Sequence, residues 1–198
     1  MMARDMQLLT PTPHVIELFT ERFQDRYGGP ENAINLLLQK FPDNRTLESI
    51  LLKSIVINVL YATQILAIIP VAKHILSLDI DDRLSQGLPE VVDEIATVRI
   101  KEKVRTNYSF ATKYCSFHNP PNYPIYDLFV DKLLNAYQRQ DRFASSSLGN
   151  LKHYVHFKQI LNDFREFYSL TDVGAKQLDS FLWLYGREVF GSTETKSI

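Results

Sequence analysis

The sequence predicts an all-α fold, a single globular domain of eight to ten helices packed as an orthogonal bundle. Three observations carry this prediction. Apolar residues recur every three or four positions, strand-like alternation never persists for more than a few residues, and prolines and glycines stand at the breaks. The 198 residues, 45% of them hydrophobic, suffice for one buried core. We assign residues 1–190 to this domain and expect 191–198 to be disordered.

The first helix is predicted to begin at Thr12, the N-cap, with Pro13 at the first helical position, where the missing N–H costs nothing. We expect Gly28-Gly29-Pro30 to end this helix and Pro30 to begin a second one. The stretch from Thr46 to about Gln64 is apolar around nearly its whole circumference, which predicts a central helix enclosed by others.

A membrane span is considered at residues 54–72, which carry no formal charge and are about long enough to cross a bilayer. Interior polar residues and Pro70 favour a core helix followed by a turn instead. We therefore expect no membrane partner.

Further helices are predicted at 70–78, 90–98, 109–117, 130–137, 151–168 and 172–185, with an acidic connection at 79–86 and a mobile, serine-rich loop at 138–150.

The overall charge of −1 argues against a generally basic nucleic-acid binder, but it does not exclude a local basic patch. Such a patch is indicated by Arg99, Lys101, Lys103, Arg105 and Lys113, which lie within fifteen residues and are opposed only by Glu102. These residues are either a solvated helix face or a positive strip for a nucleic acid, and both interpretations stay open.

A single cysteine, Cys115, excludes an intrachain disulfide and favours a reducing, cytoplasmic location. We expect Cys115 to be a core residue. His153 and His156 have the spacing of metal ligands on a helix, but two ligands are too few, so no metal and no other cofactor is predicted.

The most informative stretch runs from Ser109 to Asp127. Phe110, Tyr114 and Phe117 bury one side of a short helix, and the sequence His118-Asn119-Pro120-Pro121 stops it. Residues 123–126 should then be extended and deliver Asp127 to the start of the next helix. Asp127 is a plain N-cap, a catalytic carboxylate, or both at once.

Residues 124–127, Pro-Ile-Tyr-Asp, resemble the element that opens the catalytic helix in the helix-hairpin-helix DNA glycosylase superfamily. Residues 51–64 also resemble the central helix of that family and its polar Gln-Thr-type turn. The resemblance implies base excision, with Asp127 activating a nucleophile or stabilising charge on the sugar. It departs from the family at 103–109, which lacks the hairpin glycines, and the family lysine would fall near Tyr108 or Ser109; Lys113 lies one turn later.

We therefore predict that Asp127 and Lys113 are catalytic. The residues predicted to bind nucleic acid are Arg99, Lys101, Lys103, Arg105, Tyr108, His118, Asn119, Tyr123 and Tyr126. The leading hypothesis is a glycosylase-like nucleic-acid-binding protein. The missing hairpin glycines favour an alternative, a non-catalytic module that binds a protein partner in a defence or regulatory complex. A pocket for a free nucleoside or another small molecule is a third hypothesis.

Overall fold

Helices dominate the computed structural model, which describes residues 7–145 and 147–191, and within these ranges there are nine helices and one β-hairpin. The mostly helical prediction is thus confirmed, and no helix of the described ranges is long and apolar enough to cross a membrane. The helices are α1 (Pro13–Lys40), α2 (Leu47–Leu60), α3 (Ile68–Leu78), α4 (Asp81–Ser85), α5 (Glu90–Ala96), α6 (Tyr108–His118), α7 (Leu128–Asp141), α8 (Tyr154–Phe167) and α9 (Ala175–Phe190).

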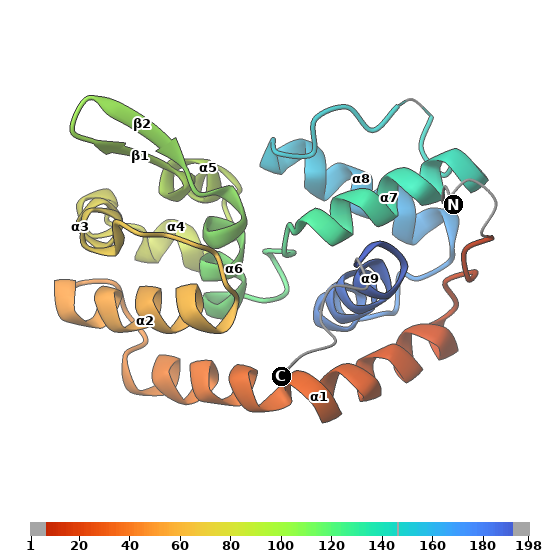
Figure 1. The fold of residues 1–198 in the computed structure, drawn as a ribbon, viewed down its shortest axis with the longest axis horizontal. Helices are drawn as coiled ribbons and strands as arrows, with labels where there is room; N and C mark the ends of the chain where they lie inside the picture. The colour runs from red at the N-terminus through yellow and green to blue at the C-terminus, as the bar shows by residue number, and fades with distance from the viewer. Residues whose placement is uncertain (1–6, 146, 192–198) are drawn as a thin grey trace.

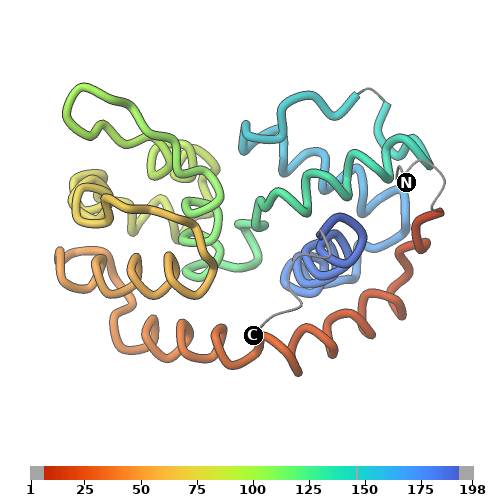
Figure 2. The backbone as a smooth tube through the Cα atoms, viewed as in Figure 1, coloured from red at the N-terminus to blue at the C-terminus, as the bar shows by residue number. Residues whose placement is uncertain are grey.

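Two lobes are visible in Figure 1. The first lobe consists of α2 to α6 with the hairpin, and the second consists of α7 to α9. Helix α1 runs along the base of both lobes and packs against α2 and α9. The tube in Figure 2 shows the chain passing from the first lobe to the second through residues 119–127, which we call the linker.

The hairpin corrects the all-α prediction. The helix expected over 90–98 ends at Ala96, and the chain continues into β1 (Thr97–Ile100), which pairs antiparallel with β2 (Lys103–Thr106). The Asn107 N–H donates to the Ala96 carbonyl at 2.8 Å and closes the hairpin base. Each strand has only four residues, so its alternation is too short to outweigh a helical pattern in the sequence.

The predicted break at Gly28-Gly29-Pro30 is wrong, because α1 continues through Pro30. A proline inside a helix removes one backbone hydrogen bond and favours a bend. Helix α1 changes direction near its middle in Figure 1. Phe23 before the proline and Ile34 after it are both buried, so packing holds the two halves of the helix in place.

Helix α2 was expected to be enclosed on all sides, and this is also wrong. Leu52, Ile55 and Val59 are exposed, Val59 by 69%, whereas Lys53 is buried on the opposite face. The Lys53 ammonium donates to the Asp43 carbonyl and to Asn44 Oδ1, and these bonds turn the lysine face inward. A count of apolar residues around the helix could not reveal this.

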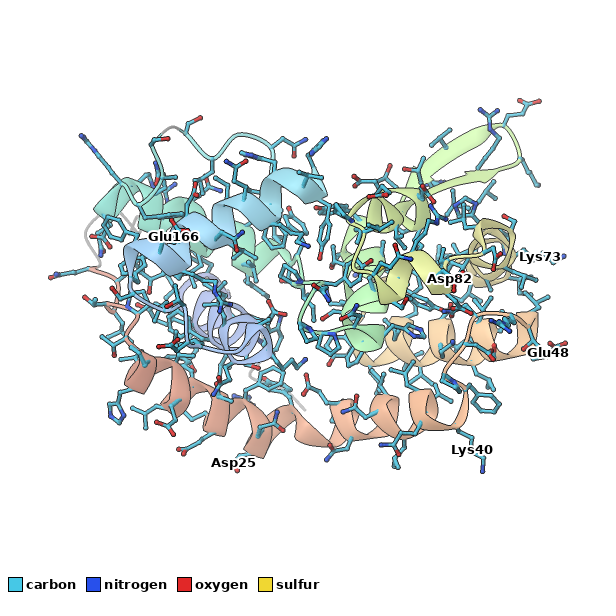
Figure 3. The ribbon with its side chains drawn as sticks, turned by 180° about the vertical axis from the view of Figure 1, so that it is seen from behind. Asp25, Lys40, Glu48, Lys73, Asp82 and Glu166 are labelled. Atoms are coloured by element: carbon cyan, nitrogen blue, oxygen red, sulfur yellow. The ribbon has the colours of Figure 1, made fainter. Side chains whose placement is uncertain are left out.

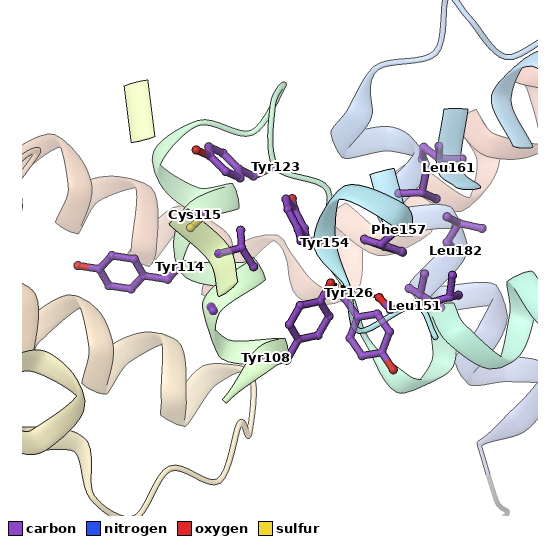
Figure 4. Packing of buried hydrophobic residues seen from close by; sticks show 14 of the residues in the cluster. Tyr108, Tyr114, Cys115, Tyr123, Tyr126, Leu151, Tyr154, Phe157, Leu161 and Leu182 are labelled. Atoms are coloured by element: carbon purple, nitrogen blue, oxygen red, sulfur yellow. Dashed lines mark hydrogen bonds between the residues drawn. The ribbon is translucent and has the colours of Figure 1, made fainter. Parts of the chain in front are cut away.

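Aromatic side chains fill the region where the lobes meet (Figure 4). The Tyr108 and Tyr126 rings lie 4.9 Å apart, and Tyr126 also packs edge-on against Phe157 of α8. Tyr154 stacks on Tyr123 of the linker with centroids 6.1 Å apart. These contacts join α6 and the linker to the second lobe.

The stretch 138–150, predicted as a mobile loop, begins as the last turn of α7 and continues as a packed segment. Phe143 and Leu148 are buried in the core, although residue 146 lies outside the described ranges. Of the predicted disordered tail, residues 192–198 also lie outside them.

Charged side chains are exposed at the periphery of the molecule (Figure 3). Those labelled there are Asp25, Lys40, Glu48, Lys73, Asp82 and Glu166.

Candidate active site

A pocket of about 560 Å³ lies between the two lobes. Its walls come from α1, the end of α2, α6, the linker, α7 and α9. Five aromatic residues line it: Phe23, Tyr27, Tyr61, Phe129 and Trp183. The Trp183 ring stands perpendicular to Tyr27 with centroids 5.0 Å apart. A concave site with aromatic walls and a few charged groups is typical of small-molecule recognition.

Lys113 and Asp127, the two residues predicted to be catalytic, meet in this pocket. The Lys113 Nζ lies 3.4 Å from Asp127 Oδ2 and donates to Ser109 Oγ at 2.6 Å. Asp127 is the N-cap of α7, and its Oδ1 accepts from the Phe129 N–H at 3.0 Å. The Lys113 side chain is 3% exposed and that of Asp127 is 21% exposed, so the carboxylate faces the pocket and the ammonium lies behind it.

The linker is held from both lobes. Both carboxylate oxygens of Asp179 on α9 accept from the Ile125 N–H, at 3.2 and 3.3 Å. Thr112 of α6 accepts from the Tyr126 N–H at 3.2 Å, and Ser109 donates to the Tyr126 carbonyl. Asp127 follows directly, so its carboxylate is fixed by the chain before it as well as by the helix it caps.

Burial shifts the ionisation of this site. It lowers the pKa of Lys113, an effect that the nearby Asp127 carboxylate opposes. Burial also raises the pKa of Asp179 to about 7, against the opposing influence of Lys176 and the Ile125 N–H. A carboxyl group with such a pKa exchanges protons near neutral pH; such shifts occur both in functional sites and in structural ion-pair networks.

The charged residues of the pocket alternate in sign. Asp127 pairs with Lys113, which interacts with Asp179; Asp179 interacts with Lys176, and Lys176 forms an ion pair with Glu31. We call these five residues the charge row. It extends from α7 to α1 and leaves the pocket close to electrically balanced, with Arg187 as a further cation in the lining.

The tyrosines predicted to stack on bases are core residues instead. Tyr108, Tyr123 and Tyr126 are buried, and their hydroxyls donate to the Leu151 carbonyl, the Leu88 carbonyl and the Asp131 carboxylate, respectively. None of the three lines the pocket.

His118 and Asn119 also lie outside the pocket lining. Asn119 caps α6 and donates to the carbonyls of Leu84 and Ser85. The His118 ring packs against Tyr114, and burial lowers the pKa of the histidine to about 3. His118 is therefore neutral at ordinary pH.

The basic residues Arg99, Lys101, Lys103 and Arg105 are all exposed on the hairpin. They do not line the pocket, and in Figure 1 the hairpin projects from the outer edge of the first lobe. The structure therefore divides the predicted strip: Lys113 is buried beside Asp127, whereas the other four basic residues are exposed on the hairpin.

Several pocket residues were missed by sequence reasoning. Glu31 and Trp183 line the pocket, and no sequence pattern singled out either of them as a site residue. Lys176 and Asp179 lie three positions apart on one face of α9, a spacing that could have indicated a charged helix face. No pattern in the sequence links that face to Glu31.

Cys115 is fully buried, as predicted, and burial raises its pKa. His156 uses its Nε2 in a hydrogen bond with the Leu148 carbonyl. Within residues 7–145 and 147–191, no three side chains of histidine, cysteine, aspartate or glutamate gather in a way that could hold a metal ion.

Comparison with known proteins gives the family. The family model described as HI_0787_N, N-terminal domain, matches residues 14–122, more than half of the chain. The chain belongs to the HI_0787_N family. The match spans α1 to α6 and so includes Glu31 and Lys113, while Asp127 lies just beyond it.

A relative from Haemophilus influenzae (strain ATCC 51907 / DSM 11121 / KW20 / Rd), named only as an uncharacterized protein, is similar to this member of the HI_0787_N family. The two are 43% identical over 149 residues, which make up 75% of this chain and 71% of the relative. No solved structure matches the chain.

Proposed function

We propose that the pocket cleaves the N-glycosidic bond of a nucleoside unit, either in a nucleic acid or as a free nucleoside. The observation that carries the proposal is the Lys113–Asp127 pair on the pocket wall. The family resemblance of residues 124–127 supports it, and so does the aromatic lining, because nucleobases stack on aromatic rings.

In this reaction the bond between the sugar C1′ and the base nitrogen breaks, and its electron pair leaves with the base. The Asp127 carboxylate stabilises the positive charge that develops on the sugar. Water then adds its hydroxyl group to C1′, and the proton it loses neutralises the departing base. Lys113, lying behind Asp127, orients that carboxylate through their ion pair.

The test is release of free base, measured by mass spectrometry, from nucleosides and from single- and double-stranded oligonucleotides that carry normal and damaged bases. We expect Asp127→Asn to lose at least about a hundredfold in rate, since it removes the charge that stabilises the sugar. Asp25→Asn, at an exposed position of α1, serves as the matched control. Base release at an unchanged rate in Asp127→Asn would end the proposal.

The role of Lys113 is tested separately. Because its side chain is 3% exposed, we expect it to support Asp127 without attacking the sugar. Borohydride should then trap no covalent complex between the protein and an oligonucleotide during base release. A trapped complex on Lys113 would replace simple hydrolysis by a lyase reaction through a Schiff base.

A module that binds a protein partner is a second candidate, favoured by the exposed apolar residues Leu52, Ile55 and Val59 on α2. The dependence of binding on salt concentration distinguishes the two candidates. Contacts to nucleic-acid phosphates weaken steeply as salt rises, whereas an apolar protein interface does not. If the hairpin strip from Arg99 to Arg105 contacts phosphates, oligonucleotide affinity should fall with salt, and Arg105→Gln should reduce that dependence.

A further inference from the structure

The charge row gives the pocket two chemically different ends. At one end Asp127 and Lys113 lie where the proposed function places the sugar. At the other end Glu31 of α1 forms an ion pair with Lys176 of α9. Both pairs line one pocket, so a nucleoside whose sugar lies at Asp127 shares that pocket with Glu31 and Lys176.

The Glu31 carboxylate has unused capacity to accept hydrogen bonds. Glu31 is 5% exposed, yet it contributes to the pocket lining. The Lys176 ammonium contacts Oε1; the Tyr61 hydroxyl lies 3.5 Å from the same oxygen, and the Gln24 amide 3.4 Å from Oε2. The last two distances are at the limit of a hydrogen bond, so they satisfy the carboxylate only weakly. A carboxylate accepts about four hydrogen bonds in total.

Lys176 offers the complementary chemistry. An ammonium has three donors, and the Lys176 side chain is about one-third exposed, so it can serve a ligand beside Glu31. The two residues together present an acceptor pair next to a donor. The edge that matches them carries two adjacent N–H groups and, beside them, a carbonyl.

We propose, resting on the proposed function, that Glu31 and Lys176 recognise the base and select a guanine-type edge. The ring N–H and the amino group donate to the Glu31 carboxylate, and the carbonyl accepts from Lys176. Such paired donors to a carboxylate form short, charge-assisted hydrogen bonds. Adenine presents an unprotonated ring nitrogen at this place, which faces the carboxylate without a proton and leaves it unsatisfied.

The remaining walls fit a purine. A volume of about 560 Å³ accommodates a nucleoside, and Tyr27, Tyr61 and Trp183 offer ring faces and edges for stacking. The Arg187 guanidinium of α9 lies over the Tyr27 ring of α1, 5.7 Å from its centroid, and donates to the Tyr27 hydroxyl at 2.6 Å, which holds this part of α9 against α1.

The experiment is ligand binding, without any cleavage. Guanosine, inosine and adenosine are titrated by calorimetry and by thermal shift into the wild-type chain and into Asp127→Asn. Inosine keeps the carbonyl and the ring N–H but lacks the amino group. We expect guanosine to bind about tenfold or more tightly than inosine, because one charge-assisted hydrogen bond is lost, and adenosine to bind least. Equal affinities for guanosine and inosine, or no binding of guanosine at millimolar concentration, would overturn the inference.

A variant tests the residues themselves. Glu31→Gln should abolish the preference for guanosine, while Glu21→Gln, at an exposed position on the same helix, should leave it unchanged. If Glu31→Gln does not fold, Lys176→Met takes its place and should lower the affinity for guanosine. An unchanged preference in a folded Glu31→Gln protein makes the Glu31–Lys176 pair a structural link between α1 and α9 and overturns the inference.

The inference and the proposed function fail separately. Glu31-dependent binding of guanosine without base release supports the recognition site and contradicts the cleavage. Release of other bases without any preference for guanosine supports the cleavage and contradicts the recognition site.

Discussion

Two buried lysines, Lys53 on α2 and Lys113 on α6, have the same burial and different surroundings. They are 1% and 2% exposed, and burial lowers the pKa of both, that of Lys53 to about 8. Lys53 donates to the Asp43 carbonyl and, at 2.7 Å, to Asn44 Oδ1. It does not line the pocket, whereas Lys113 does and lies 3.4 Å from a partly exposed carboxylate.

Asn44, one of the two hydrogen-bond acceptors of Lys53, makes further hydrogen bonds of its own. The Asn44 N–H and side-chain amide donate to the Asp81 carboxylate, and the Tyr114 hydroxyl donates to Asn44 Oδ1. This network joins the segment before α2 to α4 and α6 within the first lobe. Burial alone therefore does not distinguish the two lysines; Lys113 differs in lying beside a partly exposed carboxylate that lines the pocket.

Lys53→Met gives the largest expected effect and tests whether this network is structural. It leaves the Asn44 and Asp43 oxygens without their buried donor, and Asp81 keeps only the ion pair with the exposed Arg45 at 3.8 Å. This should lower the free energy of unfolding by about 3–5 kcal/mol. Urea denaturation measures this. Lys73→Met, at an exposed position of α3, should change stability by less than about 0.5 kcal/mol. A loss as small as that of the control would show that the network contributes little.

The second prediction concerns Asp179, which interacts with Lys113, and the pH dependence of stability. Its pKa rises from about 4 in the unfolded chain to about 7 in the folded one, so the folded state binds the proton more tightly. Its contribution to stability is therefore lost as pH rises from about 4 to about 7. Asp179→Asn removes this titration and keeps an acceptor for the Ile125 N–H.

We expect the unfolding free energy of Asp179→Asn, relative to the wild type, to increase by about 2–4 kcal/mol over that pH range. Denaturation at several pH values measures the difference. His118, whose pKa is lowered to about 3, acts in the opposite direction, but it is present in both proteins and cancels. A pH-independent difference would show that Asp179 stays ionised in the folded chain.

Much of the fold could be predicted from local chemistry. Thr12 caps α1 as predicted, and its side chain accepts from the Val15 N–H. Thr46, where the next helix was expected to begin, stands directly before α2 and accepts from the Ser49 N–H. Asp127 does begin α7 after an extended stretch. Such features depend on a few adjacent residues, which the sequence shows directly.

Features decided by distant packing could not be predicted. Pro30 remains inside α1 because both lobes pack against that helix. Lys53 faces inward on α2 because the Asn44 side chain accepts a hydrogen bond from its ammonium. For the same reason Lys113 and Asp127, fourteen positions apart, could be proposed as partners, whereas Glu31 and Lys176 come from opposite ends of the chain and could not.

Lys113→Met should differ from Lys53→Met in having little effect on stability and a large effect on base release. Its removal relieves the cost of burying an ammonium, and Asp127 keeps the Phe129 N–H and its contact with solvent. We expect a change in unfolding free energy of about 1 kcal/mol or less, together with a loss of base release of about a hundredfold. A variant as unstable as Lys53→Met that still released base would make Lys113 a purely structural residue.

Gly186→Ala gives the smallest expected effect and perturbs the Asp127 end of the pocket without touching its chemistry. A Cβ at Gly186 would lie 2.6 Å from the Phe129 carbonyl oxygen, so the first turn of α7, which Asp127 caps, must shift away from α9. We expect stability to fall by about 1 kcal/mol after the gain in helix propensity is included, and base release to fall about tenfold. Gly29→Ala is the control, since nothing lies within 4 Å of its Cβ and the strain before Pro30 offsets its gain in helix propensity. Equal rates of base release in the two variants would mean that the Asp127 carboxylate tolerates displacement. Its position at the N-terminus of α7 would then matter less for the reaction than its charge.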